Sequence, residues 1–134
     1  MITVSVDHAR KTVIARMSGF LSTEEVKAFA RKEEEAVESM DLGSGQFYLL
    51  IDTSEAIIQP QDVVAAFQHL VQNAVYKAAR IAVARHGSLT KMQTERILRV
   101  RGDTAVFETL AEAEEWLFSK PLSTDVDKPR SRAD

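Results

Sequence analysis

The stretch Gln46–Asp52, QFYLLID, decides the fold class of this 134-residue chain. Its apolar residues run continuously instead of alternating with polar ones, and the run stops at the polar residues 52–54. A short continuous apolar run that ends in turn residues is typical of a strand covered on both faces, as in a parallel sheet. The stretch therefore predicts the central strand of an α/β domain.

The segments around this strand predict the remaining elements. Alternating apolar residues in 2–6 and 13–17 predict an opening β-hairpin. Ser22 and Glu25 have the spacing of a helical capping box, so a helix is expected to begin there and to end at residues 42–45. Further patterns predict a helix over 61–76, a strand over 80–85, a helix from 88, a strand over 105–107 and a helix after 109. The order β-β-α-β-α-β-α-β-α predicts a mixed central sheet of about five strands with four helices.

The size and composition of the chain indicate one domain over residues 1–118. Residues 119–134 contain two prolines and few apolar side chains, which predicts a flexible C-terminal tail. The absence of cysteine is typical of a reducing compartment, and we expect a cytoplasmic protein. No apolar run reaches the length of about 18 residues that a transmembrane helix needs.

Charge is segregated along the sequence. Residues 21–62 hold ten acidic and three basic side chains, whereas residues 77–101 hold seven basic and one acidic. Such polarity favours a protein partner with an acidic surface, or self-association in which the basic segment of one copy meets the acidic helix of another. Aromatic residues are not interleaved with the basic ones, which argues against nucleic acid.

Four segments together resemble a known family: GFLSTEEV at 19–26, YLLIDTSEA at 48–56, RIAVARHGSLTKMQ at 80–93 and VFETLAEAEEWL at 106–117. They are similar to the SpoIIAA-like branch of the STAS-related proteins, over residues 1–118. The resemblance implies a STAS-like sheet and helix layout, shared with SEC14-type domains, and a role in regulatory interactions or in binding small lipid-like molecules. The phosphoacceptor serine of anti-sigma-factor antagonists has no counterpart in the matching turn, residues 58–62, so no phosphosite is carried over.

Ligand-binding residues are expected at the carboxyl ends of the parallel strands. The amides at the start of the helix from Ser88, with basic residues beside them, suit a small anionic ligand. The apolar loop residues near Phe67 suit a lipid-like ligand. The candidate ligand-binding residues are Asp52, Ser54, Ile57, Ile58, Phe67, Arg85, His86, Ser88 and Lys91.

Catalytic and metal signatures are missing from the sequence. Asp52, Ser54 and His86 could be imagined as a hydrolytic triad, but no G-x-S-x-G elbow supports one. The three histidines lie far apart and no cysteine accompanies them, so neither a metal nor another cofactor is expected.

Three functions remain open from the sequence. The first is a non-enzymatic regulatory or protein-interaction module without the usual phosphoacceptor serine. The alternative is a binding protein for a small amphipathic or lipid-like ligand, and an enzyme of unknown class comes third. The alternative predicts an enclosed apolar cavity beside Ile57, Ile58 and Phe67, with Arg85 near its mouth.

Overall fold

A computed structural model of the chain describes residues 1–85, 88–98 and 103–119. Within these residues, five strands form one sheet in the order β1-β2-β3-β4-β5. The first two strands pair antiparallel, and every later neighbouring pair is parallel. The predicted mixed sheet is therefore confirmed. The strands are β1 (Ile2–Asp7), β2 (Thr12–Gly19), β3 (Tyr48–Ala56), β4 (Arg80–Ala84) and β5 (Thr104–Phe107).

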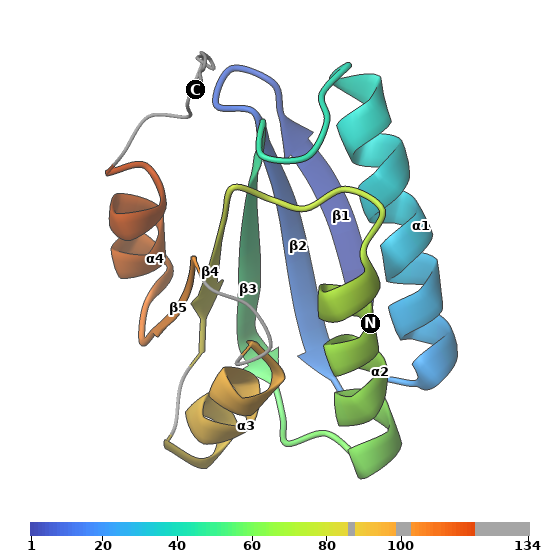
Figure 1. Cartoon of the computed structure of the whole chain (residues 1–134). Coiled ribbons are helices and arrows are strands. Elements are labelled where there is room, and N and C mark those ends of the chain that lie inside the picture. The colour runs from blue at the N-terminus through green and yellow to red at the C-terminus, as the bar shows by residue number, and fades with distance from the viewer. Residues whose placement is uncertain (86–87, 99–102, 120–134) are drawn as a thin grey trace.

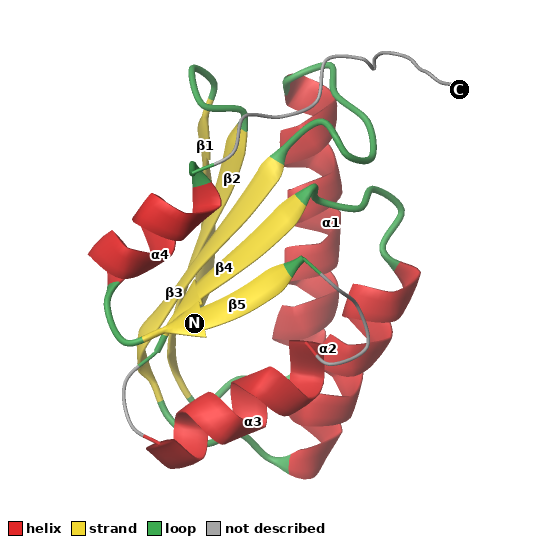
Figure 2. Ribbon diagram, turned by 60° about the vertical axis from the view of Figure 1, so that its left-hand side comes forward, coloured by secondary structure: helices red, strands yellow, loops and turns green. Residues whose placement is uncertain are grey.

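Four helices in the described part of the chain cover the two faces of the sheet unequally. They are α1 (Thr23–Ser39), α2 (Gln61–Asn73), α3 (Ser88–Leu98) and α4 (Leu110–Leu117). The first three pack on one face and α4 packs on the other (Figures 1 and 2). Because the parallel strands follow one another in sequence order, crossovers of constant hand place their helices on the same face. None of the helices among the described residues is long and apolar enough to cross a membrane.

Strand β3 lies at the centre of the sheet and is covered from both sides. Leu49 packs in the cluster that includes side chains of α1, whereas Leu50 packs in the cluster that includes α4. Both leucines are buried. Successive side chains of a strand point to opposite faces, so a strand with helices on both sides needs apolar residues at consecutive positions. This confirms the interpretation of Gln46–Asp52 as the central strand.

Local signals set the start of α1 but not the end of β3. The Glu25 amide donates to the Ser22 hydroxyl (3.1 Å), and the Ser22 amide donates to the Glu25 carboxylate (3.0 Å), which completes the predicted capping box. The prediction that the strand stops at Asp52 is wrong. A register shift beyond Arg16 lets Ser18 and Gly19 pair with Glu55 and Ala56, so β3 continues to Ala56.

Helix α2 is also shorter than the sequence predicts, because it ends at Asn73 instead of Tyr76. The Lys77 ammonium donates to the Gln72 carbonyl (2.7 Å), which lacks a partner where the helix stops. The predicted tail lies outside the described residues from position 120 onward.

Candidate functional site

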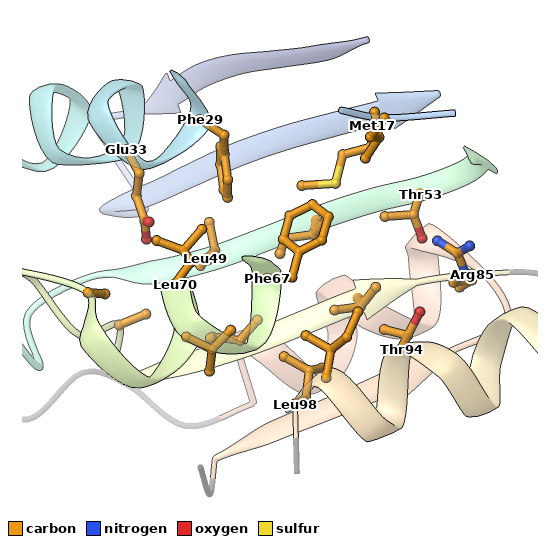
Figure 3. A pocket seen from close by; sticks show the side chains of 18 of the residues that line it. Met17, Phe29, Glu33, Leu49, Thr53, Phe67, Leu70, Arg85, Thr94 and Leu98 are labelled. Carbon is orange, nitrogen blue, oxygen red and sulfur yellow. The ribbon is translucent and has the colours of Figure 1, made fainter. Parts of the chain in front are cut away.

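A cavity of about 80 Å³ lies between the sheet and helices α1, α2 and α3 (Figure 3). Strand alternation explains its floor: every second residue of β3, from Leu49 to Thr53, faces this side of the sheet. The same alternation in β4 brings Ile81, Val83 and the following residue Arg85 to this side. The residues that line the cavity include Met17, Leu21, Phe29, Glu33, Leu49, Ile51, Thr53, Gln59, Phe67, Leu70, Tyr76, Ile81, Val83, Arg85, Gln93, Thr94 and Leu98.

The middle of the cavity is apolar. Phe67 and Leu70 project from α2 toward Leu49 of β3, and Phe29 reaches in from α1 (Figure 3). Phe67 and Leu70 are only half-buried. Val63, which lies one turn before Phe67 on the same helix, is by contrast fully buried in the core. Apolar atoms beside a void lack the contacts of a close-packed interior. An apolar group placed among them would restore those contacts.

Arg85 occupies one end of the cavity (Figure 3). The residue is 5% exposed, and its Nη2 donates to the Ile57 carbonyl at 3.0 Å. The buried Nε has no hydrogen-bond partner among the described residues. Burial lowers the pKa of the Arg85 guanidinium below its ordinary value, and no carboxylate of the described chain opposes this effect. The group nevertheless stays charged at neutral pH. Among the described residues, the buried Arg85 cation therefore has no compensating charge and lies at one end of an apolar cavity.

Gln59 joins three segments beside this end of the cavity. Its Oε1 accepts from the Leu21 amide (2.8 Å), and its Nε2 donates to the carbonyls of Gly19 (3.0 Å) and Ile57 (2.6 Å). Its backbone exchanges two hydrogen bonds with the Gln93 side chain of α3, at 3.0 and 3.1 Å. The buried Gln59 thus ties the β2–α1 loop and α3 to the β3–α2 loop.

Two threonines and a glutamate add polar groups to the lining. Thr53 and Thr94 lie near Arg85, and Glu33 lies at the opposite end (Figure 3). All three are buried. The Thr53 hydroxyl donates to the Ala84 carbonyl at 2.8 Å, so its proton is already used. The cavity consequently has a cationic end, an apolar middle and an end that carries a carboxyl group.

Of the predicted site residues whose side chains the structure describes, Phe67 and Arg85 line the cavity. Ile57 and Ile58 do not line it, because their side chains are 42% and 46% exposed on the β3–α2 loop. Lys91 is half-buried on α3 and is not a lining residue. His86 and the side chains of Ser54 and Ser88 lie outside the described residues.

Asp52 lies away from the cavity. Its parity in β3 is that of Leu50, so its side chain projects toward the α4 face. There it approaches the Arg16 guanidinium, with 3.7 Å between Oδ2 and Nε, beside a separate polar hollow of about 240 Å³. Asp52 and Arg85 therefore do not belong to one site, although both lie near the carboxyl edge of the sheet.

The sequence interpretation missed Thr53, Gln59, Thr94 and Glu33 as lining residues. Strand alternation from Leu49 through Ile51 could have found Thr53, since it has the same parity. No local signal marks Gln59, because its partners Gly19 and Leu21 are 40 and 38 residues away.

Metal-binding side chains do not gather in the described part of the chain, where no group of three or more His, Cys, Asp or Glu could hold an ion. The expected absence of a cofactor stays a prediction.

The sheet order, with three helices on one face and one on the other, defines a SpoIIAA-like α/β fold. A solved structure of this kind is an uncharacterized protein of the DUF3478 family with a SpoIIAA-like fold from Shewanella loihica PV-4. It is 19% identical, with a TM-score of 0.64, and the match covers 87% of this chain and 93% of that chain. An anti-sigma factor antagonist from Mycobacterium paratuberculosis is 14% identical, with a TM-score of 0.57, over 88% and 95% of the two chains.

At these identities the likeness shows the fold alone. It confirms the resemblance predicted from the four sequence segments at that level. No protein-family model matches the sequence, and no curated protein matches it.

Proposed function

We propose that this protein is a non-enzymatic binding module that takes up a small amphipathic molecule between the sheet and helices α1–α3. The observation that carries the proposal is the cavity itself, which has apolar walls and a buried cation at one end. Sites for small molecules are concave and mostly apolar, with a few polar groups that orient the ligand. This cavity has that composition.

The volume of the cavity limits the ligand. About 80 Å³ is well below the ~300–1,000 Å³ of sites for drug-sized molecules. A short chain or a single small ring matches this space. Native mass spectrometry of freshly purified protein, followed by extraction into organic solvent, identifies any molecule that the protein retains.

Leu70→Trp is expected to weaken binding of 1-octanol, a neutral amphiphile, by about tenfold or more, equal to about 1.4 kcal/mol. The larger side chain projects from α2 into the cavity and occupies the space that the ligand needs. Methyl chemical-shift changes during an NMR titration measure the affinity. His69→Trp is the matched control, because His69 is exposed on the same helix. Equal octanol affinity in Leu70→Trp and the wild type would place the ligand elsewhere.

A regulatory protein-interaction module is the second candidate function. Phe20 is 68% exposed, and Gln59 ties its loop to that of the exposed Ile57 and Ile58. Exposed apolar side chains on neighbouring loops are a feature of interaction surfaces. The fold likeness to an anti-sigma factor antagonist also favours this function.

The double variant Phe20→Ser, Ile58→Ser is expected to weaken self-association through these loops. The dissociation constant should rise by about tenfold or more, because apolar contact area is lost. Sedimentation velocity over a concentration series measures this. Binding of 1-octanol should be unchanged, because neither residue lines the cavity. A wild-type protein that is monomeric at every concentration would exclude this mode of interaction between copies.

A further inference from the structure

We propose that the cavity is a receptor for short-chain alkyl monocarboxylates, and that Arg85 binds the carboxylate. The inference rests on the proposed ligand-binding function and adds the chemical class of the ligand. The alkyl chain would lie along Leu49 and Phe67, which border the apolar middle of the cavity (Figure 3).

The unpaired Nε and the buried charge of Arg85 are the first argument. A guanidinium has five N–H donors, and the Arg85 side chain makes one hydrogen bond among the described residues, to the Ile57 carbonyl. Its Nε is completely buried and makes none. A buried donor without a partner is unfavourable, and a buried charge without a counterion is more so. A bound anion would supply the missing counter-charge.

The number of charges favours a carboxylate over a phosphate. Arg85 is the only cation among the described residues that line the cavity. A monoanion balances one guanidinium, whereas a phosphate dianion would keep an uncompensated charge. The planar fork of a guanidinium also matches the two oxygens of a carboxylate. Thr53 donates its hydroxyl proton to Ala84, and the Gln59 side-chain amide is fully engaged, so neither offers a phosphate a free donor.

The far end of the cavity favours one carboxylate over two. Glu33 of α1 lines that end and is buried. A second carboxylate on the ligand would lie at an end where no cation stands among the described lining residues. The apolar residues between Arg85 and Glu33 instead suit an uncharged alkyl chain.

The test compares butanoate, hexanoate, octanoate and decanoate with 1-octanol at neutral pH, each below the concentration at which it forms micelles. Octanoate is expected to bind the wild type about ten- to a hundredfold more tightly than 1-octanol, since hydrogen bonds to a charged group are the stronger kind. Affinity should rise with chain length and then level off when the cavity is full. Inorganic phosphate is titrated in parallel and is expected to bind much more weakly than octanoate.

Arg85→Lys keeps the charge but loses the planar fork, so octanoate should lose about tenfold or more in affinity. The amide NMR spectrum of the variant should match that of the wild type outside the cavity, which shows that the variant is folded. Arg31→Lys is the matched control, because Arg31 is exposed on α1 and away from the cavity.

The results separate the two proposals. If 1-octanol binds and octanoate binds no more tightly, the carboxylate inference is overturned while the ligand-binding function stands. Unchanged octanoate affinity in Arg85→Lys, or tighter binding of phosphate than of octanoate, also overturns it. If neither 1-octanol nor any carboxylate binds the wild type, both proposals fail.

Discussion

Arg85→Met is expected to increase the free energy of unfolding of the ligand-free protein by about 1–4 kcal/mol. The reason is that methionine fills a similar volume without a buried, uncompensated charge. The substitution removes one hydrogen bond, from Arg85 to the Ile57 carbonyl. That carbonyl keeps a second donor, the Gln59 side chain at 2.6 Å, so no buried acceptor is left without a partner.

Urea denaturation of both proteins after removal of any retained ligand measures the effect, provided that the slope of the unfolding free energy against urea is unchanged. Arg31→Met is the control for the change in net charge, because Arg31 is exposed, and it should alter stability by less than about 0.5 kcal/mol. A loss of stability in Arg85→Met would mean that the guanidinium is a structural group.

The combination of higher stability and weaker octanoate binding would identify Arg85 as a functional residue. Groups that serve a binding site often reduce the stability of the empty protein, because they are arranged for the ligand and not for the fold. Replacement of a structural arginine would lower the free energy of unfolding of the protein, so the sign of the change distinguishes the two roles.

Gln59→Leu is expected to lower the free energy of unfolding by about 2–4 kcal/mol. Leucine has a comparable size but cannot replace the hydrogen bonds to the Leu21 amide and the Gly19 carbonyl. The Leu21 amide is in a buried contact, so the loss of its acceptor costs more than the bond itself is worth. The Ile57 carbonyl keeps Arg85 as a donor.

Urea denaturation gives the change in stability, and hydrogen exchange at the Leu21 amide shows whether the β2–α1 loop has loosened. Gln72→Leu is the matched control, because Gln72 is exposed on α2. The free energy of unfolding of this variant should differ from that of the wild type by less than about 0.5 kcal/mol. If Leu21 exchanges equally slowly in Gln59→Leu and the wild type, Gln59 does not hold this loop.

Local sequence patterns determined the architecture of this protein. The consecutive leucines of β3 could be read as a strand buried on both faces, because alternation sends neighbouring side chains to opposite sides. The capping box of Ser22 and Glu25 marks the start of α1, since both of its hydrogen bonds join residues three positions apart. The order of the elements then restricted the topology to a mixed sheet.

Only the tertiary structure decided which residues form the site. Gln59 lines the cavity, and its side chain is held there by Gly19 and Leu21, which are 40 and 38 residues away. The fate of Arg85 was equally undetermined, because an arginine at the end of a strand is usually solvated. It is buried here by segments that are distant in the chain, including the Ile57 carbonyl 28 residues away. Periodicity is a property of neighbouring residues, whereas the burial and pairing of a polar group depend on which distant segments pack around it.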